Sequence, residues 1–473
     1  MANQRGFMEV HRVPSPEREP DARVHDYGEI YGVLPEQELK DQASRCMDCG
    51  VPFCNSACPL GNLIPDWNDL ARVGDWKGAI DQLHATNNFP EFTGLICPAP
   101  CESACVLDID DDPVMIKQIE YWTIHKAFEE GWVVAEPPGF RTGRTVAVVG
   151  SGPAGMAAAA ELNKVGHSVT VYEKDEAPGG LLRFGVPDAK LEKWMIDRRI
   201  ALLEEEGIEF VYDVEVGVDM SADELRSKHD AVVIAIGSRV ERDLELPGRD
   251  LDGVHFAMEY LYGRNRWVAE SQGRPSRMPD DPISAAGKRV VVIGGGDTSM
   301  DCVSNALREG AEDVILLDVY PEVPRDGRYP NTPWPIQPRR LITTYALDEG
   351  GKRTFGREVT GLEGEDGAVK RVLAREVTGD SSRTLQPVAG SEFAIDAELV
   401  LIAVGFTHPE RTGLLDGLDV ALDSRGNVKA GAFSTSVERV YAAGDARVGA
   451  SLVVTAIAEG RRCARVVEAA LRD

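Results

Sequence analysis

Nine cysteines are the residues of this 473-residue chain whose spacing most directly suggests chemistry, and seven of them lie between Cys46 and Cys105. Their pattern is Cys46-x2-Cys49-x4-Cys54-x3-Cys58-Pro59, followed by Cys97-x3-Cys101-x3-Cys105. Residues 1–20 are polar and contain no apolar signal-peptide core. We therefore expect a cytoplasmic protein with reduced thiols, in which such a cluster indicates a metal site rather than disulfides.

Iron–sulfur clusters explain these cysteines better than zinc or inert core thiols. The first four resemble a ferredoxin run ending in Cys-Pro, in which the fourth cysteine often binds another cluster. Two [4Fe-4S] clusters need about eight ligands, and Glu120, on a helix after Cys105, is our candidate for the last. The expected ligand groups are Cys46, Cys49, Cys54 and Cys105 for one cluster, and Cys58, Cys97, Cys101 and Glu120 for the other.

The zinc alternative is weaker because structural zinc takes four ligands per ion and few histidines lie nearby. Cys302 and Cys463 stand alone in apolar helical contexts and are expected in the core. Thioredoxin reductase carries a Cys-x-x-Cys in its nicotinamide domain, whereas Asp301-Cys302 has no second cysteine beside it. We therefore expect electrons to leave through the cysteine-rich domain.

A first glycine motif predicts a flavin site. Residues 146–155 read VAVVGSGPAG, which places Gly150, Gly152 and Gly155 in a G-x-G-x-x-G pattern after a predicted strand at 145–149. Such glycines permit a tight turn, close backbone approach to a pyrophosphate, and close packing of helix on strand. A second predicted strand, 168–172, ends at Glu173, the expected position for a carboxylate that binds a ribose hydroxyl. The alternative is a tight turn in a domain without a ligand.

Two later segments favour flavin over nicotinamide at this first motif. Gly444-Asp445 follows a predicted strand, and Asp445 can accept hydrogen bonds from ribityl hydroxyls, although a helix N-cap would explain it too. The loop 179–187 is rich in small residues that permit approach to a flat ring. The predicted contacts outside the second motif are Gly150, Gly152, Pro153, Ala154, Gly155, Glu173, Lys174, Gly180, Leu181, Arg183, Gly237, Gly444 and Asp445.

A second glycine motif predicts a nicotinamide site after a strand at 290–293. Its residues are Gly294, Gly295, Gly296, Asp297, Thr298 and Ser299, with Ser299 in the third glycine place. The next predicted strand, 313–317, ends at Asp318, whose carboxylate favours the free ribose 2′-hydroxyl of NADH. Loop arginines could instead meet the 2′-phosphate of NADPH, and the choice stays open; they are Arg325, Arg328, Arg339 and Arg340.

These motifs must be positioned by parallel sheets with crossover helices. The sequence predicts an α/β fold with two Rossmann-like domains of glutathione-reductase type, one for FAD and one for NAD(P), preceded by an α-helical iron–sulfur domain. The expected helices at 64–73 and 75–86, and a Pro-Pro-Gly boundary at 137–139, belong to the helical domain. The expected division is 1–139 for that domain, 140–285 and 399–473 for the flavin domain, and 286–398 for the nicotinamide domain.

Composition excludes several classes of partner. The net charge of −27 disfavours binding to nucleic acid and to anionic membranes. No stretch reaches the roughly 20 apolar residues of a membrane span. A 43% share of hydrophobic residues is enough for a sizeable core.

With both cysteine sets, both glycine motifs, the 180–187 loop and Ala443-Gly444-Asp445, the whole chain resembles the small (beta) subunit family of bacterial glutamate synthase. It is also similar to the reductase part of dihydropyrimidine dehydrogenase. The resemblance implies FAD, NADPH or NADH, two [4Fe-4S] clusters with the non-cysteine ligand matched to Glu120, and a hetero-oligomer with a large (alpha) subunit. That subunit carries FMN and glutaminase activity, and makes L-glutamate from glutamine and 2-oxoglutarate.

One departure from the family concerns the nicotinamide. Many members carry paired arginines after the second strand of this domain, where the present chain has Val319-Tyr320-Pro321. Two other functions stay open: a standalone NAD(P)H reductase that feeds a ferredoxin-type acceptor, and a non-catalytic subunit that only carries cofactors. No general acid or base is predicted, because the cofactors carry the chemistry.

Overall fold

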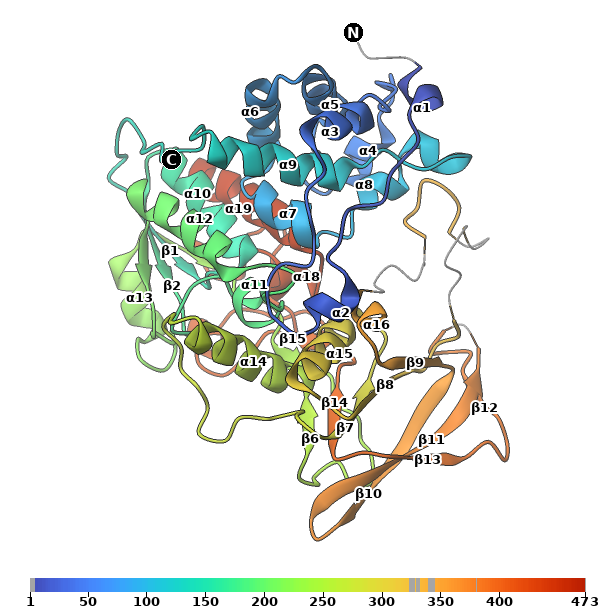
Figure 1. The fold of residues 1–473 in the computed structure, drawn as a ribbon. Helices are drawn as coiled ribbons and strands as arrows, with labels where there is room; N and C mark the ends of the chain where they lie inside the picture. Colours follow the sequence, from blue (N-terminus) through green and yellow to red (C-terminus); the bar gives the residue numbers. More distant parts are fainter. Residues whose placement is uncertain (1–4, 323–327, 329–331, 339–344, 380, 473) are drawn as a thin grey trace.

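The computed structural model describes residues 5–322, 328, 332–338, 345–379 and 381–472. Two parallel five-stranded sheets form its centre, and a helical N-terminal part covers one of them (Figure 1). The predicted fold class is confirmed. In the part of the chain that the structure describes, no helix combines the length and apolarity needed to cross a bilayer.

The first sheet carries the first glycine motif and has the strand order β16-β4-β1-β2-β3, with every pairing parallel. Its central strands are fully buried runs of β-branched residues, as a sheet covered on both faces requires. The strands are β1 (Thr145–Val149), β2 (Ser168–Tyr172), β3 (Glu209–Val211), β4 (Ala231–Ile234) and β16 (Val440–Ala442). The accompanying helices are α10 (Pro153–Lys164), α11 (Leu181–Phe184), α12 (Lys193–Glu205), α13 (Ala222–Lys228), α17 (Leu414–Leu418), α18 (Asp445–Val448) and α19 (Val453–Arg472).

The second sheet carries the second glycine motif and has the order β6-β14-β7-β8-β9, again with parallel pairings. Its strands are β6 (Val254–Phe256), β7 (Arg289–Ile293), β8 (Asp313–Asp318), β9 (Lys352–Phe355) and β14 (Leu399–Ile402). Its helices are α14 (Ala257–Ser271), α15 (Asp297–Glu309) and α16 (Tyr345–Asp348).

This topology corrects the expected domain division. Residues 399–402 were assigned to the flavin domain, but β14 pairs with β6 and β7 in the nicotinamide sheet. The strand β6 and the helix α14 also precede the expected start at residue 286. The chain enters this domain at β6 and leaves it after β14, and these two strands are neighbours in the sheet. The hydrophobic pattern of a strand does not show which strands it pairs with. The short ladder between β5 (Val240–Glu241) and β15 (Phe406–His408) joins the two connecting segments.

An antiparallel sheet projects from the nicotinamide domain (Figure 1). It was not predicted, and its strands are β10 (Arg357–Glu365), β11 (Ala368–Thr378), β12 (Gln386–Pro387) and β13 (Phe393–Asp396). One face packs on the parallel sheet through a cluster that includes Leu362, Val369 and Val372.

The N-terminal part is helical, as predicted, and the helices expected at 64–73 and 75–86 are present. Asp75 caps the second of these by accepting a hydrogen bond from the Gly78 amide at 2.9 Å. The elements are α1 (Gly6–Glu9), α2 (Pro20–Arg23), α3 (Glu36–Ala43), α4 (Phe53–Ala57), α5 (Ile64–Val73), α6 (Trp76–Thr86), α7 (Pro90–Ile96), α8 (Pro100–Ser103), the 3₁₀ turn η1 (Val106–Ile109) and α9 (Ile116–Glu129).

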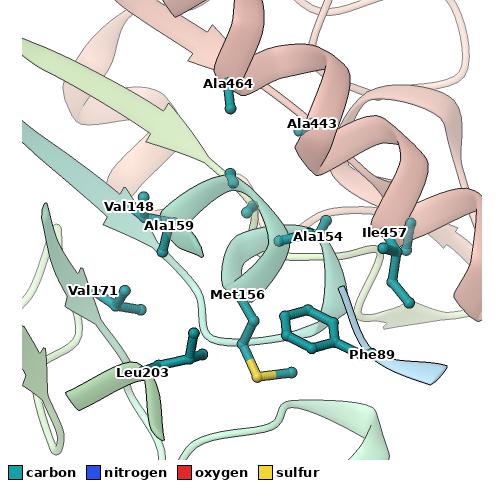
Figure 2. Packing of buried hydrophobic residues seen from close by; sticks show 14 of the residues in the cluster. Phe89, Val148, Ala154, Met156, Ala159, Val171, Leu203, Ala443, Ile457 and Ala464 are labelled. Carbon is teal, nitrogen blue, oxygen red and sulfur yellow. The ribbon is translucent and has the colours of Figure 1, made fainter. Parts of the chain in front are cut away.

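The helical part shares a hydrophobic core with the flavin domain. Phe89, at the start of α7, lies beside Met156 of α10 and Ile457 of α19 (Figure 2). Phe92, Leu95 and Tyr121 belong to the same buried cluster. The boundary at 137–139 therefore separates two segments of sequence without separating two independent cores.

A buried ion pair reinforces this junction. Arg199 of α12 donates to both carboxylate oxygens of Glu91 in α7, at 2.6 and 3.0 Å. Both side chains are at least nine-tenths buried. Such a pair adds little stability compared with apolar residues in the same place. Removing one partner, however, leaves the other as a buried charge without a counter-ion.

We expect Arg199→Gln to lower the free energy of unfolding by about 3 kcal/mol, because it leaves the Glu91 carboxylate buried without its cation. Urea titration followed by circular dichroism measures the change. The control is Lys77→Gln, which breaks an exposed pair with Asp81 and should cost less than about 1 kcal/mol. If both variants lose the same free energy of unfolding, the Arg199–Glu91 pair does not stabilise the junction.

Candidate cofactor sites

A cavity of about 300 Å³ opens at the carboxyl edge of the first sheet. Its wall combines the glycine loop after β1, the end of β2, the 180–186 loop and the start of α18. The predicted contacts that line it are Gly150, Gly152, Pro153, Ala154, Glu173, Lys174, Gly180, Leu181, Gly237 and Asp445. The structure thus brings together segments up to three hundred residues apart in the sequence, as a dinucleotide site at a sheet edge requires.

The glycines of the first motif have separate roles in this wall. A Cβ on Gly155 would lie 1.9 Å from the Gly150 carbonyl oxygen, so Gly155 is needed for the turn to close. A Cβ on Gly152 would meet no atom within 4 Å and would project into open space. Gly152 therefore leaves room for a ligand, whereas Gly155 serves the fold.

Glu173, which follows β2, is hydrogen-bonded to the glycine loop that follows β1. Its Oε2 accepts from the Ser151 amide at 3.0 Å and from the Ser151 hydroxyl at 2.5 Å. Lys174, the next residue, pairs with Glu410 at 2.6 Å across the same cavity. An anionic side chain at the end of β2 and a cation beside it fit the ribose and diphosphate of FAD.

Three of the predicted contacts do not line the cavity. Gly155 lies behind it, and Gly444 packs against Ala154. Arg183 is turned away, since its Nε donates to the Pro178 carbonyl at 2.5 Å and its guanidinium pairs with Asp197. Arg183 therefore fixes the shape of the glycine-rich loop in this structure, and its contact with a cofactor remains a prediction.

Several lining residues were not predicted, and all but Ser151 lie outside the motifs. They are Ser151, Val214, Glu215, Val216, Ser238, Arg239, Glu410 and Thr412. Arg239 is the cation among them, and it faces Asp175 at 3.6 Å. The signal that could have found it is its place directly after Gly237-Ser238, beyond the end of β4.

Asp445 lies at the start of α18, where the helix begins at the cavity. Burial raises the pKa of its carboxyl to about 6, although the hydrogen bond from the Ser451 hydroxyl at 2.6 Å lowers it. A carboxylate at this position is poised to accept hydrogen bonds from a sugar-like chain of hydroxyls.

The second glycine loop stands at the carboxyl end of β7 and leads into α15. A Cβ on Gly295 would lie 2.2 Å from Oδ2 of Asp318, so this glycine lets the Asp318 carboxylate reach the loop. Gly294, Gly296, Asp297 and Thr298 complete the predicted loop, and a Cβ on Gly296 would meet open space. The loop and the strand-end carboxylate therefore come together as predicted.

Of the four expected arginines, the structure describes only Arg328, and it does not contact Asp318. Arg328 instead contacts the helical domain through the Ser103 carbonyl and Asp108. Arg325, Arg339 and Arg340 lie outside the described residues. The cation beside Asp318 is Arg353 of β9, whose Nη2 donates to Asp318 Oδ2 at 2.6 Å and to the Gly295 carbonyl at 3.0 Å. Sequence reasoning missed it because it lies thirty-five residues downstream on a neighbouring strand.

The cysteines separate into the two expected groups. One small cavity is lined by Cys46, Cys49, Cys54 and Cys105, and another by Cys58, Cys97, Cys101 and Glu120. Cys302 and Cys463 are fully buried in the two sheet domains, as predicted. In the described part of the chain, no group of three or more His, Cys, Asp or Glu side chains is arranged to hold a metal ion.

Glu120 is held in place by hydrogen bonds to one of its two carboxylate oxygens. Its Oε1 accepts from the Thr93 hydroxyl at 2.5 Å and from the Asn87 amide at 2.9 Å, and both bonds go to this one oxygen. Gly94 of α7 permits this arrangement, because a Cβ there would lie 2.8 Å from the Tyr121 Cα. The two helices thus meet closely at Gly94 and Tyr121, three residues before Cys97 and one residue after Glu120.

The cysteines beside Glu120 are buried, and those of the other group are partly buried. Burial raises the pKa of Cys46, Cys54 and Cys97 to about 12. Since iron binds the thiolate, occupancy of these sites releases protons.

The three cavities form a row. Ile96 lines the flavin cavity and the next residue, Cys97, lines the Glu120 site; Val453 and Val454 repeat this relation from α19. Ile64 and Ile116 line both cysteine sites. Neighbouring cavities are therefore separated by single layers of apolar residues.

Comparison with protein-family models finds two matches. Residues 144–460 match the pyridine nucleotide-disulphide oxidoreductase family. Residues 23–132 match the family described as dihydropyrimidine dehydrogenase domain II, 4Fe-4S cluster.

Relatives are similar over the whole chain. A glutamate synthase [NADPH] small chain of Mycobacterium tuberculosis is 50% identical, with 99% of this chain and 96% of the relative covered. A glutamate synthase [NADH] of Schizosaccharomyces pombe is 46% identical over 98% of this chain but only 22% of its own length. The structure of Mycobacterium tuberculosis FprA in complex with NADPH has a TM-score of 0.55 at 19% identity, over 71% of this chain and 85% of that one, and supports the fold alone.

We expect Gly152→Ala to weaken FAD binding at least about tenfold, because the methyl group enters the space where a diphosphate would lie. The flavin-free variant should unfold at the same urea concentration as the parent, since the added Cβ meets no protein atom. Fluorescence titration with FAD measures the affinity. Unchanged affinity would show that the ligand does not approach this glycine.

Asp445→Asn should stabilise the flavin-free protein at pH 8 by about 2 kcal/mol. The folded-state pKa of about 6 lies above the value of 3.8 for a free aspartate, so the ionised form costs stability above pH 6. The gain should disappear as the pH falls toward 4, where the carboxyl is protonated. Urea titrations at both pH values, with the exposed Asp280→Asn as control, measure it.

Proposed function

This chain belongs to the family of glutamate synthase small chains, within the pyridine nucleotide-disulphide oxidoreductases, and on that premise we propose that it is the electron-input subunit of a glutamate synthase. It oxidises NAD(P)H and supplies electrons to a large (alpha) subunit. That subunit, with FMN and glutaminase activity, makes L-glutamate from glutamine and 2-oxoglutarate.

The observation that carries the proposal is the row of three cavities. The flavin cavity adjoins the site of Cys58, Cys97, Cys101 and Glu120, which adjoins the site of Cys46, Cys49, Cys54 and Cys105. When bound, FAD would take hydride from NAD(P)H, and two [4Fe-4S] clusters would carry its electrons singly. The order of the sites leads from the flavin domain into the helical domain.

The residues of this chain supply orientation and insulation. Asp445, Glu173 and Lys174 are placed to hold the polar parts of FAD around a mainly apolar cavity. Ile96 and Val453 close the side that faces the iron–sulfur domain, so water is kept out between the sites. No side chain needs to move a proton for this function.

Of the two cysteine sites, the last one in this order has the less buried cysteines. Gly50 and Val51, between Cys49 and Cys54, are exposed, and Val51 is among the most exposed large apolar side chains of the described residues. An exposed loop over the final cysteine group is where a redox partner would dock.

Affinity purification of the tagged chain under anaerobic conditions tests the assignment to glutamate synthase. A large partner with glutaminase activity should co-purify, and the complex should form glutamate with NADPH or NADH. A chain that oxidises NAD(P)H with an artificial dye but has no such partner would be a standalone reductase. A chain loaded with flavin and iron that does not turn over would be a non-catalytic subunit.

Cys101→Ser should lower the iron content from about eight atoms to about four, because one ligand of one four-iron cluster is lost. Oxidation of NAD(P)H with a dye that accepts electrons at the flavin should persist, while glutamate formation by the complex should fall at least about a hundredfold. Cys302→Ser, a buried thiol outside both groups, is the matched control for iron content. Full iron in both variants would remove Cys101 from the ligands.

A further inference from the structure

Arg353 supplies a cation beside Asp318, although this chain has Val319-Tyr320-Pro321 where many family members carry paired arginines. Its side chain extends from β9 across the end of β8 to the second glycine loop, and is about 93% buried, with 7% exposed. One nitrogen, Nη2, contacts both Asp318 and the Gly295 carbonyl. Asp318 is at the position where a dinucleotide motif places its ribose-binding carboxylate, and Gly295 belongs to the glycine loop of the same motif.

The guanidinium is not fully used by the protein. Its Nε is buried and has no hydrogen-bond partner among the described residues. A buried donor without a partner costs free energy, so its retention indicates a ligand that completes the arrangement. The guanidinium also lies over the ring of Phe355, 4.7 Å from its centre, which fixes its plane.

Space for such a ligand adjoins this group. Phe355 lines an open cavity of about 540 Å³, together with Pro321 and Glu376. Two of its lining residues follow the pair closely in the sequence: Pro321 is three residues after Asp318, and Phe355 is two residues after Arg353. An adenosine end held on the glycine loop would have room on this side.

We propose that Arg353 is the specificity residue that lets this chain accept the ribose 2′-phosphate of NADPH, with Asp318 as the counter-ion of its guanidinium. The proposal deepens the function proposed above and rests on it for the identity of the dinucleotide. Asp318 alone would accept from the 2′-hydroxyl of NADH and repel a phosphate. Arg353 cancels that charge and offers a planar donor group suited to phosphate oxygens.

Arg328 is the described member of the arginines predicted to meet the 2′-phosphate, and it contacts Asp108 of the helical domain instead. Arg357, close to Arg353 in the chain, pairs with Glu376 at 3.0 Å. It lines the same cavity without contacting Asp318, and it therefore provides a matched control.

The test uses fragments of the dinucleotide, so that it depends on neither flavin, iron nor the large subunit. Calorimetry with 2′,5′-ADP and with 5′-AMP compares binding with and without the 2′-phosphate. Arg353→Gln should weaken 2′,5′-ADP about 30-fold, as loss of a charged hydrogen-bonded contact does, and 5′-AMP less than about threefold. Arg357→Gln should leave the ratio of the two affinities unchanged.

Two further variants keep the result decisive if Arg353→Gln is unstable. Arg353→Lys should recover part of the preference for 2′,5′-ADP, because the charge remains. Asp318→Asn should strengthen 2′,5′-ADP and weaken 5′-AMP. Equal weakening of both fragments in the Arg353 variants, or no change in either, would overturn the proposal while leaving the electron-input function intact.

Discussion

The packing of the iron–sulfur domain on the flavin domain is the constraint on which the rest of the structure depends. Phe89, Phe92 and Leu95 insert into the core formed by α10 and α19, and the Arg199–Glu91 pair holds the adjoining turn of α7. The same helix leads directly to Cys97. A shared core therefore fixes how far the flavin cavity lies from the nearer cysteine group, and a flexible linker would leave that distance undefined.

The nicotinamide domain is held against the flavin domain by buried charged groups as well as by apolar contacts. Lys190, which follows the glycine-rich loop of the flavin domain, pairs with Asp301 of α15 at 2.9 Å. The Tyr345 hydroxyl donates to the same Asp301 oxygen at 2.6 Å, so the buried carboxylate has two partners from different elements. The two glycine loops are thus tied together through α15, and the orientation needed for hydride transfer is set by buried polar contacts.

Local patterns predicted much of the fold and of the sites, while contacts between distant segments escaped them. The strands at 145–149 and 168–172 and the grouping of the cysteines follow from spacing and from buried β-branched runs, which are local properties. Strand β14 was assigned to the wrong domain because an apolar run in the sequence does not show which strands it will pair with. Arg353 and Arg239 were missed for a similar reason, since their meaning comes only from the carboxylates they meet.

The backbone contact of α7 with α9 at Gly94 has a consequence for electron transfer. Cys97 and Glu120 are carried on helices that meet without intervening side chains, so the space between them is set by main-chain geometry. A close-packed interior of this kind deforms little when a charge arrives. We therefore expect a group bound between Cys97 and Glu120 to have the same surroundings before and after it gains an electron.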